Sequence, residues 1–138
     1  MEWTITLNEG NEYAEIVTGG VVDRYGSLEM AKEISNLLKK TGIKKILVDH
    51  SKVSAVSGEI VEIYQRPKEL KEIGAVPGIQ VAEVVKAAHK EFFRFLELVC
   101  VNRGFLFLTF DDKNSALKWL LASNRNQIAD AQGLSYPA

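Results

Sequence analysis

The sequence predicts an α/β domain whose mixed, mostly parallel sheet has four or five strands, an antiparallel N-terminal edge, and helices packed mainly on one face. In the second half of the chain, short β-branched or aromatic runs alternate with stretches of helical periodicity. This alternation is typical of parallel strands joined by right-handed crossovers. The first half opens instead with two alternating segments separated by a turn signal, which indicates an antiparallel pair.

The first strands are predicted from the alternation of apolar and polar residues. Residues 3–7 and 13–17 alternate in this way, and the turn signal of residues 8–11 lies between them. Gly19-Gly20 interrupts the second strand, so we expect Val21-Val22 to form a short third piece.

A helix and then a buried central strand follow. The helix should be capped by Ser27 and end at Gly42, because apolar residues recur between them at helical spacing. The run Ile46–Val48 is short and β-branched, which is typical of a strand buried on both faces. We expect it to end at Asp49 and to lead through a polar loop into a helix that begins near Ser57.

The loop from Asp49 to Gly58 is the candidate polar site. In open α/β sheets, ligands bind beyond the carboxyl ends of the strands, beside the helix that follows. An exposed helix N-terminus also binds anions through its unpaired N–H groups. The candidate ligand-binding or anion-binding residues are therefore Ser51, Ser54, Ser57 and Gly58. Alternatively, Ser57 is only an N-cap, which contributes about 1 kcal/mol.

The C-terminal half contains the remaining alternation of strands and helices. Pro67 should break or restart the helix that precedes it, because proline lacks the amide and clashes with the preceding turn. Two apolar strands are predicted over Ile79–Val85 and Phe105–Phe110, and the longest helix, Lys86–Arg103, connects them. A last helix over Ala116–Ala122 follows.

We place one domain at residues 1–122 and treat residues 123–138 as a polar C-terminal tail. Seventeen basic and eighteen acidic residues give a formal charge of −1, which argues against a nucleic-acid partner. The single cysteine, Cys100, cannot form an internal disulfide. The N-terminus lacks the pattern of a signal peptide, and no apolar run approaches the roughly 20 residues that span a bilayer. We therefore expect a cytoplasmic protein.

The long helix carries two apolar stripes. The first, which should cover the sheet, consists of Ala88, Phe92, Phe95 and Val99. The second consists of His89, Phe93, Leu96 and Cys100. Because one stripe is enough to cover a sheet, the second must meet the neighbouring helix, a partner subunit in a homodimer, or an apolar ligand. We favour a cavity or a dimer, since His89 supplies a polar group that a sealed core does not need.

Motifs that indicate catalysis are missing from the sequence. Asp49 and His50 form the one acid–base pair near the candidate site, and adjacent residues of a strand point to opposite faces. There is no nucleophile elbow, Walker loop, metal-binding pair or glycine-rich dinucleotide motif. We therefore expect a non-enzymatic protein without a cofactor or a metal.

In its order of elements the chain resembles the STAS domains, and within them the SpoIIAA-like proteins. The segments that carry the resemblance are Trp3, Lys45-Ile-Leu-Val-Asp49, Asn102-Arg-Gly104, the strand Phe105–Phe110 and Ala116-Leu-Lys-Trp-Leu120. The resemblance implies a sheet-and-helix sandwich, a fold also compared with CRAL-TRIO lipid-binding domains.

The resemblance also implies two kinds of function. In anti-sigma factor antagonists, a partner kinase phosphorylates a serine in the motif Asp-Ser-Ser-Gly-Leu. Ser57-Gly58 matches its Ser-Gly pair, but the acidic residue and the second serine are missing from Ala55-Val-Ser-Gly-Glu59. The SpoIIAA-like proteins suggest small apolar ligands and membrane association instead. We therefore predict a homodimeric module that binds an apolar or amphipathic small ligand, or a membrane surface. The alternative is a regulatory module that binds a protein through residues 51–58.

Overall fold

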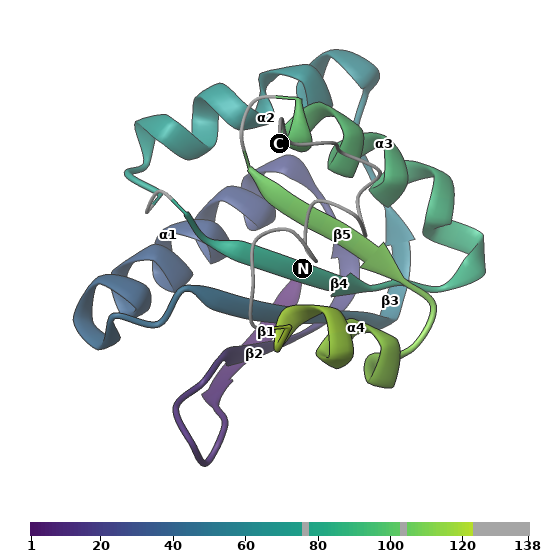
Figure 1. Ribbon diagram of the computed structural model, residues 1–138. Coiled ribbons are helices and arrows are strands. Elements are labelled where there is room, and N and C mark those ends of the chain that lie inside the picture. Colours follow the sequence, from purple (N-terminus) through teal and green to yellow (C-terminus); the bar gives the residue numbers. More distant parts are fainter. Residues whose placement is uncertain (76–77, 103–104, 123–138) are drawn as a thin grey trace, which may run out of the picture.

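The computed structural model describes residues 1–75, 78–102 and 105–122, which form one five-stranded sheet with helices on both faces (Figure 1). The strands lie side by side in chain order, and β1 and β2 pair antiparallel whereas all other neighbours are parallel. The strands are β1 (Glu2–Leu7), β2 (Ala14–Val22), β3 (Lys45–Val56), β4 (Gln80–Val84) and β5 (Leu106–Phe110). The helices are α1 (Arg24–Thr41), α2 (Ile60–Glu72), the 3-10 turn η1 (Ala87–His89), α3 (Lys90–Val101) and α4 (Lys113–Leu120).

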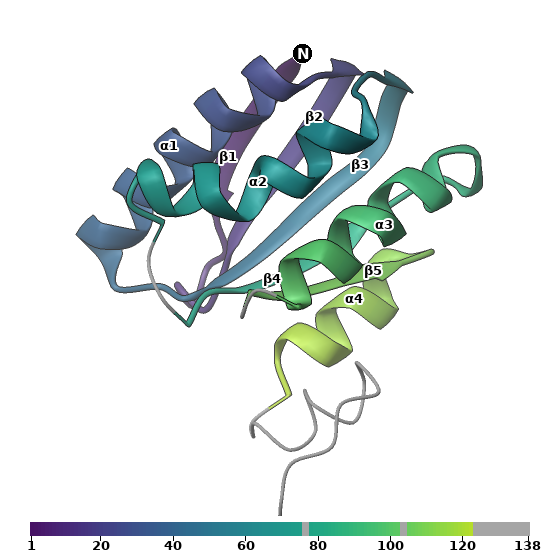
Figure 2. The ribbon, with the colours of Figure 1, turned by 90° about the horizontal axis from the view of Figure 1, so that it is seen from above.

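The predicted α/β class, the mixed sheet and the antiparallel edge are confirmed. The three apolar strands of the second half, β3, β4 and β5, are parallel neighbours, as their sequence pattern predicted. Helices α1, α2 and α3 lie on one side of the sheet and α4 lies on the other (Figure 2). All three parallel crossovers therefore place their helices on the same face of the sheet, and α4, which follows the last strand, covers the other face.

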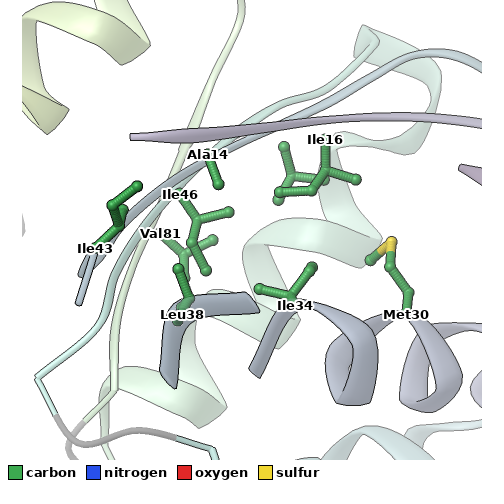
Figure 3. Packing of buried hydrophobic residues seen from close by; sticks show 9 residues of the cluster. Ala14, Ile16, Met30, Ile34, Leu38, Ile43, Ile46 and Val81 are labelled. Atoms are coloured by element: carbon green, nitrogen blue, oxygen red, sulfur yellow. The ribbon is translucent and has the colours of Figure 1, made fainter. Parts of the chain in front are cut away.

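Strand β3 supplies the core on both faces because its successive side chains point to opposite sides. Ile46 and Val48 pack against Ile34 and Leu38 of α1 (Figure 3). Leu47 packs on the other face against Trp119 and the rest of α4. A further buried cluster, centred on Phe93, lies beneath α2 and α3.

The predicted loop after Asp49 is instead the second half of β3. Strand β2 continues without interruption to Val22, so residues 49–56 of β3 have a partner with which to form hydrogen bonds. The pairing register shifts twice, between Val17 and Gly19 and again between Gly20 and Val21 of β2. At each shift β3 contains one residue more than β2, so both are β-bulges. The prediction of a loop after Asp49 is therefore wrong, because pairing with β2 outweighs the weak local preference of residues 49–56 for a loop.

The boundaries of the helices also differ from those predicted; α4, for instance, spans Lys113–Leu120 instead of Ala116–Ala122, because Asp112 caps it. Helix α1 begins at Arg24, because the side chain of Asp23 accepts a hydrogen bond from the Gly26 amide at 2.6 Å; Ser27, the predicted cap, lies inside the helix. Helix α2 continues through Pro67, which is buried, so tertiary packing of α2 outweighs the loss of one hydrogen bond. Helix α3 begins only at Lys90, after the 3-10 turn, so α1 with 18 residues is longer than α3 with 12.

Some predictions fall outside the described residues. These are the polar tail of residues 123–138, the end of the long helix at residues 103–104, and residues 76–77 of the loop before β4.

Candidate functional site: a cavity between three helices and the sheet

A cavity with a volume of about 120 Å³ lies between the sheet and helices α1, α2 and α3. Most of its wall is apolar. The strands contribute Ile46, Val48 and Val81, and the helices contribute residues such as Ile34 and Phe93. The cavity is therefore an unfilled space at the centre of the larger helical layer, where three helices meet over one face of the sheet.

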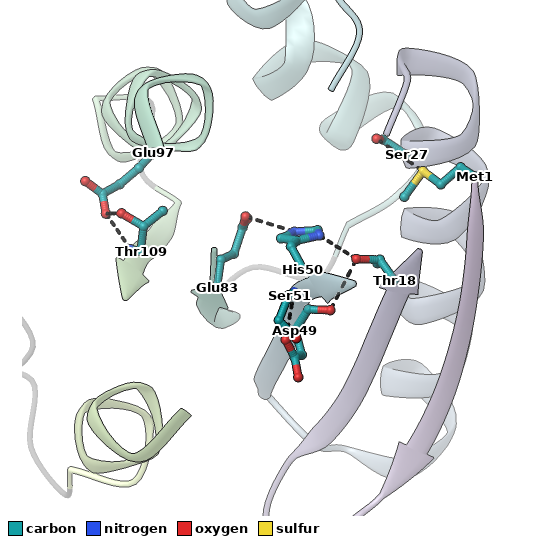
Figure 4. Close-up of polar contacts among 9 residues, drawn as sticks. All are labelled: Met1, Thr18, Ser27, Asp49, His50, Ser51, Glu83, Glu97 and Thr109. Atoms are coloured by element: carbon teal, nitrogen blue, oxygen red, sulfur yellow. Dashed lines mark hydrogen bonds and ion pairs between the residues drawn. The ribbon is translucent and has the colours of Figure 1, made fainter. Parts of the chain in front are cut away.

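A row of buried polar side chains lies beside the cavity, and two of its members, His50 and Glu83, line the wall (Figure 4). The His50 ring, on β3, lies 2.7 Å from Thr18 Oγ1 through its Nδ1 atom and 3.2 Å from Glu83 Oε2 through its Nε2 atom. The same ring stacks on Phe93 with 4.4 Å between ring centroids. All four side chains are buried. Three adjacent strands and α3 thus fix the orientation of one imidazole.

A hydroxyl, an imidazole and a carboxylate in this order resemble a catalytic triad. Thr18 is, however, only 1% exposed and does not line the cavity, whereas His50 and Glu83 do. The Thr18 hydroxyl also donates a hydrogen bond to the main-chain oxygen of Asp49 at 3.2 Å. Since the hydroxyl lies behind the imidazole, it cannot reach a molecule in the cavity, and the row provides polar anchoring rather than a nucleophile.

Arg66 brings a positive charge to the wall from α2. Its Nε atom is buried without a hydrogen-bond partner, and no ion pair or hydrogen bond of its guanidinium exists within the described residues. Burial lowers the pKa of the Arg66 guanidinium, and the carboxylate of Glu69 is the main opposing influence. Glu69 itself pairs with Arg24 of α1 at 2.6 Å. The cavity wall is therefore mostly apolar, and its polar part contains the positive Arg66 and the negative Glu83.

The predicted serine cluster does not form a helix N-terminal site. Ser51 and Ser54 lie in β3, and both are exposed. Ser57 is exposed too, but it lines the cavity, and its amide donates a hydrogen bond to the Val22 main-chain oxygen at 2.7 Å. Helix α2 begins at Ile60 without a side-chain cap, so the prediction that Ser57 caps this helix is wrong. Gly58, which is also exposed, joins the end of β3 to that helix.

The second stripe of the long helix is buried more deeply than the first, in which Val99 is the one buried member and the described residues Ala88, Phe92 and Phe95 are not buried. Phe93, Leu96 and Cys100 are buried within their own subunit, and only Phe93 and Leu96 of this stripe line the cavity. Burial raises the pKa of the Cys100 thiol to about 12, so this cysteine is not a reactive nucleophile at neutral pH. His89 is half-buried in η1, away from the cavity wall, with its Nδ1 atom unpaired.

The assignment of the stripes failed because the apolar face of α3 is wide. From the first stripe, Ala88 is exposed and precedes the helix, and Phe92 and Phe95 are half-buried at its edge. Periodicity locates the centre of such a face poorly, and the packing of α2 beside α3 decides which edge stays exposed.

The polar residues of the cavity were largely missed by sequence reasoning. In the sequence, His50 stands out only as the neighbour of Asp49, and no motif distinguishes Arg66 or Glu83. A charged residue inside an apolar strand, as Glu83 is in Gln80–Val84, was the one local signal available, since buried carboxylates are rare.

The described part of the chain has neither a metal-binding cluster nor a membrane-spanning helix. It contains no group of three or more histidine, cysteine, aspartate or glutamate side chains that could hold a metal ion. None of its helices combines the length and the apolar character needed to cross a membrane.

Comparison with known proteins identifies the class of fold. No protein-family model and no curated protein matches the sequence. An uncharacterized protein of the DUF3478 family with a SpoIIAA-like fold, from Shewanella loihica, matches with a TM-score of 0.53 and 19% identity, covering 86% of this chain and 92% of that chain. An anti-sigma factor antagonist from Mycobacterium paratuberculosis matches with a TM-score of 0.53 and 13% identity, covering 88% and 96%.

The chain therefore has a STAS-like fold. More particularly, it is the SpoIIAA-like arrangement that the sequence resemblance implied.

Proposed function

We propose that this protein is a non-enzymatic binding module that holds a small apolar or amphipathic ligand between the sheet and helices α1, α2 and α3. The observation that carries the proposal is the apolar cavity of about 120 Å³ in that position. Interiors of proteins are normally packed with few voids larger than a water molecule. An apolar cavity of about 150 Å³ stays dry and takes up benzene, so this cavity suits an apolar group of similar or slightly smaller size.

Native mass spectrometry of protein purified from cells tests the proposal, because it detects a retained small molecule directly. The matched variants are Ala31→Leu, which places a larger side chain on the cavity wall, and Asn36→Leu, an exposed position of the same helix. Ala31→Leu should abolish retention of the ligand and Asn36→Leu should preserve it. Equal retention by both variants, or no uptake of any apolar probe by the unaltered protein, would contradict the proposal.

We also propose that the module is a homodimer that associates through the outer surface of α2 and α3. Three large apolar side chains are exposed there: Val61 (62%), Tyr64 (56%) and Leu98 (56%). Tyr64 packs edge-on against Phe95 with 5.4 Å between ring centroids, which joins the two helices into one apolar surface. Exposed apolar surface of this kind is typical of an interaction site.

Sedimentation of Leu98→Glu tests the dimer. This variant should be a folded monomer, whereas Leu7→Glu, an apolar position of similar kind on β1, should remain dimeric. A monomeric unaltered protein would refute the dimer, and its binding to lipid vesicles through Leu98 would show that the same surface contacts membranes.

A regulatory module that docks a protein partner is the second candidate. It is favoured by the shared fold with an anti-sigma factor antagonist and by the exposure of Ser51, Ser54 and Ser57. If this candidate is correct, intact protein isolated from cells should contain a phosphorylated fraction that disappears in Ser57→Ala and persists in Ser51→Ala. Absence of that fraction under all growth conditions would remove the support for a phosphorylation switch.

A further inference from the structure

We propose that the ligand is a small monocarboxylate, whose carboxylate binds the Arg66 guanidinium and whose hydrocarbon tail fills the apolar part of the cavity. This inference rests on the proposed ligand-binding function and specifies the chemistry of the ligand.

The first argument is that Arg66 is the charged group of the cavity wall that lacks a direct partner. A buried N–H group without a hydrogen bond is unfavourable, and a guanidinium remains charged under all ordinary conditions. Its Nε–H group is fully buried and makes no hydrogen bond. An arginine fork matches the two oxygens of a carboxylate, so a ligand carboxylate would supply the missing acceptors.

The second argument concerns the carboxylates already present. One oxygen of Glu69 pairs with Arg24 at 2.6 Å, and one oxygen of Glu83 lies 3.2 Å from the His50 ring. Glu69 keeps its other oxygen, Oε1, without a partner, but Glu69 does not line the cavity. Each carboxylate therefore has one oxygen engaged elsewhere, and the charge of both still acts on Arg66 through space.

These neighbours determine the charge of the ligand. Glu83 lies on the same cavity wall as Arg66, so a phosphate dianion would be repelled more strongly than a carboxylate. An ammonium group would meet the guanidinium, which is unfavourable as well. A single negative charge on a compact group is therefore the best match for one arginine in a wall that also carries the Asp23 and Glu83 carboxylates.

The volume determines the size of the tail. Benzene, with six carbon atoms, occupies an apolar cavity of about 150 Å³, so a cavity of about 120 Å³ accommodates roughly five carbon atoms. Hexanoate, with five carbons beyond its carboxyl group, is thus a suitable probe. Its tail would lie beside Phe93 and Val48, which form the apolar wall.

Calorimetric titration with hexanoate, 1-hexanol and hexylamine tests the inference on ligand-free protein. The three probes share one tail and differ in the charge of the head. The unaltered protein should bind hexanoate most tightly, hexanol about tenfold or more weakly, and hexylamine least, as expected when one charge-assisted contact is gained or lost.

Arg66→Met removes the charge at similar length, and Arg94→Met, at an exposed position of α3, is the matched control. Arg66→Met should lose about tenfold or more in hexanoate affinity and keep its hexanol affinity, and Arg94→Met should change neither. Arg66→Lys keeps the charge but lacks the guanidinium fork, so its hexanoate affinity should lie between those of Arg66→Met and Arg94→Met. If Arg66→Met does not fold, Arg66→Lys and the three probes on unaltered protein still give the answer.

The outcomes separate this inference from the proposed function. Equal binding of hexanoate and hexanol, or hexanoate binding that is unaffected in Arg66→Met, overturns the monocarboxylate and leaves the apolar cavity as the site. Failure of all three probes, together with no retained molecule in native mass spectrometry, overturns the proposed function as well.

Discussion

On one face of the sheet a single eight-residue helix, α4, seals the strands; on the other face three helices leave a cavity. Between α4 and the strands, the side chains of Leu47, Ala82 and Leu120 are fully buried and belong to one packed cluster. Under the three helices, polar side chains of β3 and β4 are buried beside empty space. The comparison suggests that stability is concentrated on the α4 face and that binding capacity is concentrated on the other.

The largest expected effect comes from a charge on the sealed face. Leu47→Asp should prevent folding, because the new carboxylate would be buried among apolar side chains without a partner. Val48→Asp, one residue further along β3, should also destabilise the protein strongly, but less, since Val48 faces the cavity. Circular dichroism and thermal unfolding measure both variants, and a more stable Leu47→Asp than Val48→Asp would reverse the comparison.

A somewhat smaller effect is expected from breaking the polar row. His50→Leu removes the partner of the Glu83 carboxylate and one of the two partners of the buried Thr18 hydroxyl, and it should cost about 3 kcal/mol of unfolding free energy. Glu83→Gln keeps an acceptor for the imidazole and should cost only about 1 kcal/mol. Urea unfolding gives both values; equal losses would show that the hydrogen bond to His50 is unimportant.

A pH-dependent effect is expected on the α4 side. The Ser115 amide, and then its hydroxyl, hold the pKa of the Asp112 carboxyl below its ordinary value. Because the folded-state pKa is the lower one, the stabilising contribution is complete above the unfolded value of about 3.9 and is lost as the pH falls through the folded pKa. In Asp112→Asn, the unfolding free energy should therefore fall less as the pH is lowered between these two pKa values. Glu9→Gln, in an exposed turn, should not change this fall.

The smallest effects are expected at the residues that precede helices α1 and α2 on the cavity side. Asp23→Ala should cost about 1 kcal/mol, because its side chain caps α1. Ser57→Ala should change the unfolding free energy by less than about 0.5 kcal/mol, because Ser57 is exposed and caps no helix. A Ser57→Ala loss as large as that of Asp23→Ala would contradict the observed start of α2.

The set of strands and their parallel arrangement were predictable from local sequence. Short apolar runs such as Ile46–Val48, each followed by a helical stretch, have few other arrangements that bury both faces of a strand. The same logic placed the antiparallel pair at the N-terminal edge. These features depend on periodicities of two and 3.6 residues, which are properties of the chain alone.

The composition of the site was decided by tertiary structure. Thr18, His50, Glu83 and Arg66 come from four elements and meet only because β2, β3 and β4 align in register and α2 crosses above them. The length of β3 was decided in the same way, since its second half is a strand only where β2 offers hydrogen bonds. Local sequence determines which side chains lie on one face of an element; which faces meet, and where a cavity remains between them, depends on the packing of elements distant in the chain.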